Sequence, residues 1–212
     1  GYLGTKISRK NIIKVRNKYK LPVKYLFYPA RFWPHKNHLR IIEALGFIKK
    51  KYNLDIQIVL CGSHTGSIRE DTFKKVMTLA TKLGIIKNVI HLGYVEDVDM
   101  SVLYKEAQAL IMPTFFGPTN IPILEAWTFG CPVITSDIRG IREQADDAAF
   151  LVNPRSVDSI ANGIKEVWED KNLRNELAKL GKKRLVIYDK DDYNKRLSDI
   201  INEAKDKINK IN

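Results

Sequence analysis

The feature of this sequence that most constrains its fold is the alternation of short apolar runs with longer segments of helical periodicity. Apolar runs of four to seven residues, rich in Val, Ile, Tyr and Phe, are typical of buried strands. We expect six such strands, at residues 24–28, 55–61, 89–92, 108–112, 132–135 and 149–152. Because most of each run is apolar, rather than alternately apolar and polar, the pattern predicts a parallel sheet that is covered on both faces.

The segments between these runs have the periodicity of amphipathic helices. Four helices are predicted between strands, at residues 37–52, 67–83, 97–107 and 121–129, and the last begins at a cap formed by Thr119 and Asn120. Three more are predicted after the last strand, at residues 156–169, 171–186 and 190–209. The expected fold is therefore α/β, a Rossmann-like doubly wound parallel sheet of about six strands followed by C-terminal helices.

This pattern divides the chain into three parts. Residues 1–23 are expected to form a basic N-terminal helix or linker, residues 24–168 the α/β domain, and residues 169–212 the C-terminal helices. No segment approaches the roughly 18 consecutive apolar residues of a membrane span. Cys61 and Cys131 lie in apolar contexts, as buried free thiols do, so a reducing cytoplasm is the simplest compartment.

The charge balance favours anionic partners. The 212 residues hold 36 Lys and Arg against 24 Asp and Glu, a net charge of +12. Nucleic acid, a phosphate-bearing small molecule and an acidic membrane surface all fit such a charge. Because the aromatic residues lie mostly in apolar strands and helices, a nucleic-acid-binding module is the weaker alternative.

The basic residues concentrate near the start of the sequence. The first 24 residues hold eight basic side chains and no acidic one: Lys6, Arg9, Lys10, Lys14, Arg16, Lys18, Lys20 and Lys24. The simplest interpretation is a solvated helix face. Peripheral contact with an anionic membrane surface stays open.

The loops that follow the strands are where a ligand is expected, because an open parallel sheet binds ligands at the carboxyl ends of its strands. After the first strand, Arg31 and Lys36 stand five positions apart just before a helix, an arrangement that could grip two linked phosphates. In the alternative interpretation, Arg31 pairs with a surface acid and Lys36 is solvated. Gly62 follows the second strand in a turn that lets the backbone approach a ligand closely, although such a glycine is more often only a turn.

Two further loops could complete such a site. After the third strand, the backbone of Gly93, Tyr94 and Val95 could reach a planar base, or form only a turn. After the fourth strand, a Gly-Pro-Thr-Asn turn at 117–120 precedes a helix and offers free N–H groups to an anion. Glu125 lies in that helix among apolar neighbours, and a carboxylate there needs a partner, which sugar hydroxyls would supply. Alternatively, Glu125 stabilises the start of the helix electrostatically.

Taken together, these segments resemble a known family. The sequence holds, in order, Ala30-Arg31-(x4)-Lys36-Asn37, Cys61-Gly62, His91-Leu92-Gly93-Tyr94-Val95, Ala109-(x3)-Pro113, Pro122-(x)-Leu124-Glu125-Ala126-(x3)-Gly130-(x)-Pro132-Val133-Ile134 and Arg139-Gly140-(x2)-Glu143-(x8)-Val152-(x)-Pro154. From about residue 24 to 168 it is similar to the C-terminal, nucleotide-sugar-binding domain of retaining GT-B glycosyltransferases of group 1, or family 4. The rest resembles that family's closing helices.

The resemblance implies roles for individual residues. Arg31 and Lys36 would bind the donor diphosphate, Glu125 would hold the ribose hydroxyls, and the base would lie beside Gly93, Tyr94 and Val95. The backbone of Thr119, Asn120 and Ile121 would approach the phosphate and the donor sugar, in a donor loop that includes Gly62, Gly117 and Pro118. Because positive side chains and a helix dipole would neutralise the leaving diphosphate, we expect no cofactor and no catalytic metal.

One departure from the family pattern concerns a second glutamate. The family usually carries it eight positions before the ribose-binding one, and counting back from Glu125 gives Gly117. Because that glutamate helps to orient the donor sugar, the sugar is bound differently here or another group replaces it.

The resemblance also implies partners. The expected activity is transfer of a sugar from a nucleotide sugar to a saccharide or lipid-linked acceptor, with retention, in the cytoplasm or at the inner face of the membrane. An acceptor-binding domain of similar size normally precedes this one, so we expect the chain alone to bind donor but to be nearly inactive. The alternative enzyme is a nucleotide-sugar epimerase or hydrolase half-domain.

Overall fold

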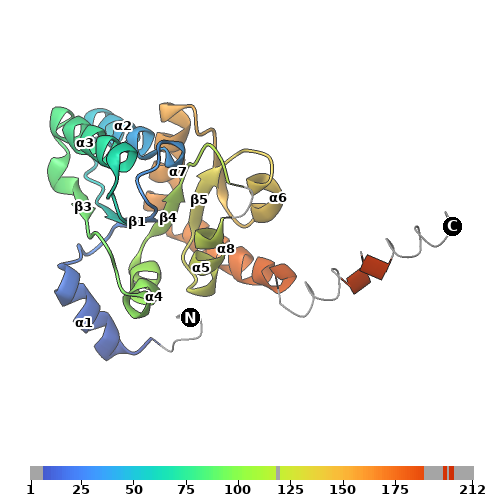
Figure 1. Ribbon diagram of the computed structural model, residues 1–212. Coiled ribbons are helices and arrows are strands. Elements are labelled where there is room, and N and C mark those ends of the chain that lie inside the picture. The colour runs from blue at the N-terminus through green and yellow to red at the C-terminus, as the bar shows by residue number, and fades with distance from the viewer. Residues whose placement is uncertain (1–6, 118–119, 189–197, 200, 203–212) are drawn as a thin grey trace.

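The computed structural model describes residues 7–117, 120–188, 198–199 and 201–202. All six predicted strands are present: β1 (Leu26–Pro29), β2 (Ile58–Cys61), β3 (Val89–His91), β4 (Ala109–Met112), β5 (Val133–Ser136) and β6 (Phe150–Val152). They form one parallel sheet in the order β3-β2-β1-β4-β5-β6 (Figure 1). This is the strand order of Rossmann-like doubly wound folds, so the predicted fold class is confirmed.

Helices cover both faces of the sheet (Figure 1). One face carries α2 (His38–Tyr52), α3 (Ser67–Lys82) and α7 (Val157–Glu169), and the other carries α4 (Asp97–Glu106), α5 (Ile121–Thr128) and α8 (Lys171–Arg184). The shorter elements are η2 (Pro34–Lys36), η3 (Ile86–Asn88), α6 (Ile141–Ala145) and η4 (Leu185–Tyr188). The helix predicted over 190–209 lies outside the described residues, except for two short helical stretches at 198–199 and 201–202.

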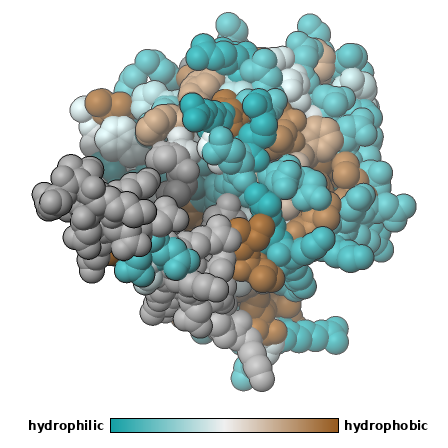
Figure 2. Space-filling view, turned by 90° about the vertical axis from the view of Figure 1, so that its right-hand side faces the viewer, coloured by the Kyte–Doolittle hydropathy of each residue, from teal (hydrophilic) through white to brown (hydrophobic). Residues whose placement is uncertain are grey.

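One side of the surface is largely polar among the described residues. On the side that carries α6 and the end of α8, hydrophilic residues dominate and hydrophobic ones form scattered groups among them (Figure 2). Within the described part of the chain, no helix combines the length and the apolar character needed to cross a bilayer.

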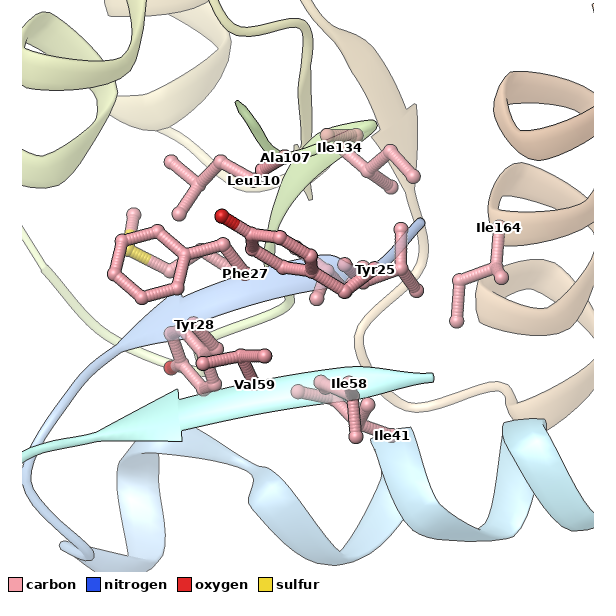
Figure 3. Close-up of a cluster of buried hydrophobic side chains, with 14 of the residues drawn as sticks. Tyr25, Phe27, Tyr28, Ile41, Ile58, Val59, Ala107, Leu110, Ile134 and Ile164 are labelled. Atoms are coloured by element: carbon pink, nitrogen blue, oxygen red, sulfur yellow. The ribbon is translucent and has the colours of Figure 1, made fainter. Parts of the chain in front are cut away.

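The core is built around β1, one of the two central strands (Figure 3). Successive side chains of a strand point to opposite faces of the sheet. Phe27 therefore packs on one side, with its ring edge-on to Tyr104 of α4 at 5.0 Å. Tyr28 packs on the other, where its ring lies 4.8 Å from that of His38 in α2. Because both faces are covered, residues on both must be apolar, which explains the unbroken apolar run that the sequence shows.

The N-terminal helix α1 (Arg9–Tyr19) begins at a Ser8 cap and packs against α4. The Nζ atom of Lys18 lies 2.6 Å from Oδ2 of Asp99. The hydroxyl of Tyr19 donates to the same carboxylate oxygen at 2.9 Å, and Arg16 pairs with Glu106 at 3.2 Å. Hydrogen bonding, chiefly to Asp99, raises the pKa of the Lys18 ammonium above its ordinary value. The interpretation of this segment as a simply solvated face is therefore wrong for these two basic residues.

Three of the four histidines of the chain surround Phe32, next to the carboxyl edge of β1, β2 and β3. Phe32 stacks on His38 at 4.4 Å and meets His91 edge-on at 5.2 Å, while His64 stacks on Phe73 at 4.4 Å. His38 is 2% exposed, and burial lowers its pKa to about 3. The cluster therefore holds His38 in its neutral form.

The contact between α5 and α8 yields a stability prediction. Trp127 of α5 is fully buried, its indole N–H donates to the carbonyl of Ala148, and a Cβ at Gly181 of α8 would overlap its ring. We expect Gly181→Ala to lower the free energy of unfolding by about 1–3 kcal/mol, because a rigid buried ring cannot move aside. The higher helix propensity of alanine, about 1 kcal/mol, offsets only part of this. Urea unfolding measures the change.

The matched control for that substitution is Lys179→Ala, at an exposed position of the same helix. It should stay within about 0.5 kcal/mol of the parent protein. Equal stability of the Gly181 and Lys179 variants would mean that α8 does not pack on Trp127 in this way.

The buried histidine yields a pH prediction. An unfolded histidine takes up its proton near pH 6.5, whereas His38 stays neutral until far lower pH, so stability falls as pH falls below 6.5 toward 3. We expect His38→Phe, which keeps a stacking ring but cannot titrate, to lose about 2 kcal/mol less than the parent between pH 7.5 and 5.0. Urea unfolding at the two pH values checks this. Identical losses would show that His38 is not buried in its neutral form.

Candidate functional site

The connection from β1 to α2 carries the two predicted phosphate-binding cations. Arg31 is exposed directly after the strand, and Lys36 is partly buried at the end of η2. The hydroxyl of Tyr28 donates to the carbonyl of Lys36 at 2.7 Å, which fixes this turn to the sheet. Burial lowers the pKa of the Lys36 ammonium. In the part of the chain that the structure describes, neither cation forms an ion pair, so the alternative in which Arg31 pairs with a surface acid finds no support there.

Asn37 locks this connection to two other loops. It is buried and adopts the left-handed conformation with φ 60°. Its side-chain amide donates to the carbonyl of Pro113, after β4, at 2.7 Å and to that of Pro154, after β6, at 2.8 Å. Asparagine is one of the few residues that tolerate this conformation. One side chain thus fixes three loops at the carboxyl edge. The sequence contained Asn37 in the family motif, but its bonding partners were missed.

The loops after β1, β2 and β3 enclose a cavity of about 180 Å³. Its lining consists of Pro29, Ala30, Arg31, Cys61, Gly62, Gly93, Tyr94, Val95 and Met100. Five of these residues were singled out from the sequence, from three separate loops: Arg31, Gly62, Gly93, Tyr94 and Val95. Tyr94 is 82% exposed, so its ring is free to move over a ligand at the rim.

Gly62 is required for this packing. It has a φ of 134°, and a Cβ there would lie 2.7 Å from the carbonyl oxygen of Ala30. Its N–H donates to the carbonyl of Gly93 at 2.9 Å, and its own carbonyl lies 3.1 Å from Nε2 of His91. The glycine therefore lets three loops approach one another closely.

Glu125 lies in α5 and is partly buried. The hydroxyl of Tyr104, from α4, donates to its Oε2 atom at 2.6 Å. The charge of the carboxylate also acts on Cys61, which lies in the wall of the cavity. Burial, and after it the charge of Glu125, raises the pKa of the Cys61 thiol to about 12. The structure thus brings Glu125 to the same end of the sheet as the cavity. Tyr104 had no recognisable signal in the sequence, since its contact with Glu125 depends on how two helices pack.

The turn before α5 differs from its expected form. Pro118 and Thr119 lie outside the described residues, and Ile121 is exposed as the first residue of α5. Asn120 occupies the N-cap position, but its side-chain amide turns back to donate to the carbonyl of Gly117 at 3.2 Å instead of capping the helix.

Both backbone polar groups of Asn120 are bound by Gln144 of α6. The Asn120 N–H donates to Oε1 of Gln144 at 3.3 Å, and the Asn120 carbonyl accepts from its Nε2 at 3.3 Å. The N–H of Asn120 is therefore not free to approach a phosphate here, contrary to the expectation. The sequence did not single out Gln144, because a role of this kind requires knowing which buried backbone groups need a partner.

Gly117 stands where the family usually has its other glutamate. A Cβ at this position would lie 2.6 Å from Oδ1 of Asn120. The amide end of the Asn120 side chain would therefore have to shift to admit a side chain at 117.

The sequence contains two Asp-x-Asp triplets, a motif that can bind a cation: Asp97-Val98-Asp99 at the start of α4, and Asp189-Lys190-Asp191, which lies outside the described residues. Asp99 is 7% exposed and bonded to Lys18 and Tyr19, so this carboxylate is taken up by the contact with α1. No group of three or more His, Cys, Asp or Glu residues in the described ranges is arranged to hold a metal ion.

The cavity lies at the carboxyl ends of β1, β2 and β3, the edge at which open α/β sheets bind their ligands, and β1 borders β4, where the order of the strands reverses. Arg31 lines a small cavity, Lys36 lies farther along the same β1–α2 connection, and the charge of Glu125 acts on Cys61 in the cavity wall. Such an arrangement can bind a phosphate group next to a planar ring and hold hydroxyl groups on the carboxylate.

The sequence of this chain is similar to those of known glycosyl transferases. The profile described as "Glycosyl transferases group 1" matches residues 9–184. O-antigen chain mannosyltransferase B of Escherichia coli is 28% identical over 168 residues, which are 79% of this chain and 43% of that protein.

Two of the similar solved structures illustrate the likeness. Anabaena HepE, solved in complex with UDP and glucose, has a TM-score of 0.79 at 21% identity over 93% of this chain and 53% of that one. The C-terminal domain of a group 1 glycosyl transferase from Francisella tularensis has a TM-score of 0.70 at 24% identity, over 84% of this chain and 92% of that domain. The chain thus spans about half the length of the full-length proteins it matches, and corresponds to one half of a GT-B fold. On the match of the family profile, this chain belongs to the group 1 glycosyl transferases.

Proposed function

We propose that this chain binds a nucleoside diphosphate sugar and forms the donor-binding half of a glycosyltransferase. The observation that carries the proposal is the cavity in which Arg31, Gly62 and the loop 93–95 meet at the carboxyl edge of the sheet. The similar Anabaena protein has been solved with UDP and with UDP-glucose, which supports a nucleotide sugar as the ligand class.

The donor is proposed to lie across the β1–α2 connection. Its base enters the cavity beside Gly93, Tyr94 and Val95, and its diphosphate contacts Arg31 and Lys36. A partly buried ammonium such as that of Lys36 attracts an anion more strongly than a fully solvated one, because the local dielectric constant is lower. The Tyr104 hydroxyl holds one oxygen of Glu125, which orients the carboxylate toward the ribose hydroxyls.

The same cations are proposed to assist the reaction. As the bond between sugar and diphosphate breaks, negative charge grows on the leaving group, and preorganised positive side chains stabilise it. We propose that Arg31 and Lys36 do this without a metal ion and without a cofactor. Transfer with retention at the anomeric carbon is part of the proposal and follows from the family resemblance.

A second domain is proposed to supply the acceptor. The chain covers 43% of the Escherichia coli mannosyltransferase and 53% of the Anabaena protein, so a comparable half is proposed to complete the reaction cleft. The name of the Escherichia coli relative supports a saccharide acceptor in polysaccharide assembly, free or lipid-linked. The chain alone would then bind donor but transfer sugar slowly, in the cytoplasm or at a membrane face that the basic residues of α1 could contact.

The first functional prediction concerns the diphosphate. Among UDP, GDP, ADP and CMP, we expect one diphosphate to bind with a single saturable isotherm in calorimetry, equally with Mg²⁺ and with EDTA. Arg31→Ala and Lys36→Ala should each weaken it by about 1.5–3 kcal/mol, the scale of a hydrogen bond to a charged group. Both variants should keep the unfolding free energy of the parent, since no described ion pair is lost.

The control for these variants is Lys74→Ala, at an exposed position of α3. It should leave nucleotide affinity unchanged. Binding that depends on Mg²⁺ would overturn the metal-free proposal, and absence of binding by any nucleotide in a folded sample would overturn the donor site itself. A basic nucleic-acid-binding module would instead bind mixed oligonucleotides more tightly than any mononucleotide.

The second functional prediction concerns the ribose. The parent protein should bind the ribonucleotide about tenfold or more tightly than its 2′-deoxy form, because a carboxylate hydrogen bond to a hydroxyl contributes about 1.5–3 kcal/mol. Glu125→Ala should remove this preference, and Tyr104→Phe should reduce it, since the carboxylate loses its orienting partner. Competition calorimetry with the two nucleotides measures the ratio. An unchanged ratio in Glu125→Ala would mean that Glu125 does not bind the ribose and only stabilises the start of its helix.

A further inference from the structure

The connection from β4 to α5 is attached to the rest of the protein near both of its ends. Near its start, the hydroxyl of Thr114 and the N–H of Phe115 both donate to the carbonyl of His35, each at 2.8 Å. His35 lies in η2, within the β1–α2 connection. At its end, Asn120 is held through its backbone by Gln144. The β4–α5 connection therefore runs from an anchor on the β1–α2 connection to an anchor on α6.

The anchor on α6 is buried. Gln144 is 7% exposed and Asn120 is 2% exposed. One amide group accepts from the N–H and donates to the carbonyl of Asn120, both at 3.3 Å. The same carbonyl accepts from the N–H of Ile123 at 3.0 Å, which is the first turn of α5. Because two hydrogen bonds join the same two residues, Gln144 fixes both the distance and the orientation of the backbone at Asn120.

Gln144 is itself held by α8. Arg184, the last residue of that helix, donates to the carbonyl of Glu143 at 2.7 Å and to the carbonyl of Gln144 at 3.2 Å. It also pairs with the carboxylate of Asp146 at 3.2 Å. The planar guanidinium presents several donors in a fixed geometry, which suits three acceptors in one short segment. Arg184 thus fixes the backbone from which the side chain of Gln144 extends.

The residue that follows α6 is in an unusual conformation. Asp146 has a φ of 49° and a ψ of −121°, which a residue with a Cβ atom rarely adopts. Its N–H donates to the carbonyl of Arg142 at 2.8 Å, and its carboxylate accepts from Arg184. Such conformations persist only where surrounding contacts impose them, and they are concentrated at functional sites. The strain at Asp146 is therefore a second observation that points to a function for this segment.

We propose that Gln144 is a positioning residue for the donor sugar and that Arg184 holds Gln144 in place. The inference rests on the proposed function and assigns the sugar to the β4–α5 connection. One anchor of this connection, His35, is next to Lys36, so the two anchors together set its backbone relative to the proposed diphosphate site. Gly117 has no side chain, so at that residue the connection contacts a sugar only through its backbone. The position of the backbone, which Gln144 sets, then governs the contact.

The other parts of the donor have separate supports. None of the described residues that line the base cavity belongs to the β4–α5 connection. Glu125, proposed to hold the ribose, is oriented by the hydroxyl of Tyr104 at 2.6 Å and not by Gln144. Loss of the Gln144 contact should therefore affect the sugar of the donor more than its base or its ribose.

The test compares a nucleoside diphosphate with the nucleotide sugar built on it, by calorimetry on the full chain. The probes are UDP with UDP-glucose, GDP with GDP-mannose and ADP with ADP-glucose, and the pair that binds the parent protein is used for the variants. Gln144→Met keeps the length of the side chain and removes both hydrogen bonds. We expect it to weaken the nucleotide sugar at least about fivefold more than the diphosphate, the scale of one or two hydrogen bonds. The preference for ribose over 2′-deoxyribose should stay unchanged.

Arg184→Met should have the same selective effect, about threefold, and Arg184→Lys should restore part of it because a cation remains near the carbonyls of α6. Its matched control is Arg174→Met, in the first turn of α8. Arg174 donates to the carbonyls of Val167 and Trp168, both at 2.7 Å, beside the amino end of β4. This variant removes the same kind of contact away from the donor edge, so it should lower stability without changing the ratio of the two affinities.

The matched control for Gln144→Met is Gln108→Met, which makes the same chemical change at the amino end of β4. It should change neither affinity. Thermal unfolding of each variant establishes that it is folded. If Gln144→Met does not unfold cooperatively, Arg184→Met and Arg184→Lys supply the same comparison.

The outcomes separate this inference from the proposed function. Equal weakening of the diphosphate and the nucleotide sugar in Gln144→Met, in protein that still binds both, would overturn the positioning role and leave the donor site standing. Gln144 would then only satisfy a buried backbone. A change of the ratio in Arg174→Met as large as that in Arg184→Met would also overturn it. Absence of binding by all three pairs in the folded parent protein would instead contradict the donor site, and this inference with it.

Discussion

The parallel pairing of the six strands is the constraint on which the rest of this structure depends. Parallel strands require a crossover between neighbours, and in this chain the crossovers place helices on both faces of the sheet (Figure 1). They also place the end of every strand at one edge. Residues as far apart in sequence as Arg31 and Tyr94 therefore line one cavity, although no local sequence pattern predicts that they meet.

The loops at that edge are then fixed by a few polar contacts. Asn37 donates to two carbonyls from different loops, and Gly62 permits an approach that any side chain would prevent. Both have positive φ values, which few residues adopt without strain. These contacts hold Arg31 and Lys36 in place without using their charged groups. Their charges thus stay available to a ligand, and preorganisation of this kind is what binding and catalysis require.

The turn before α5 illustrates how one fold carries different sites. Gly117, Asn120 and Gln144 form a connected unit in which the asparagine fills the space beside the glycine and the glutamine binds the asparagine backbone. A side chain at 117 would therefore displace the amide of Asn120. Proteins that share this sheet can differ in such local groups of residues, and their functions differ accordingly. The fold alone therefore does not specify the donor sugar.

Much of the fold could be predicted from the sequence. The six strands and the helices between them follow from periodicity and apolar runs, because burial on both faces leaves that pattern in any chain. Arg31, Lys36, Gly62 and Glu125 could also be singled out as candidates, the first three because they lie in connections that follow apolar strands and Glu125 because it is a charged residue among apolar neighbours. Their roles toward a ligand stay predictions.

Other features could not be predicted, because they depend on contacts between distant segments. Lys18 was expected to be solvated and instead binds Asp99, and the N–H of Asn120 was expected to be free and is bound by Gln144. The partner of Glu125, Tyr104, comes from another helix. The sequence by itself determined which residues are buried in strands and helices, because buried positions recur with the period of the helix or strand and are filled by apolar residues. Only the tertiary structure decided which polar groups satisfy one another, as Gln144 does for the backbone of Asn120, because hydrogen bonding depends on distances that sequence spacing does not contain.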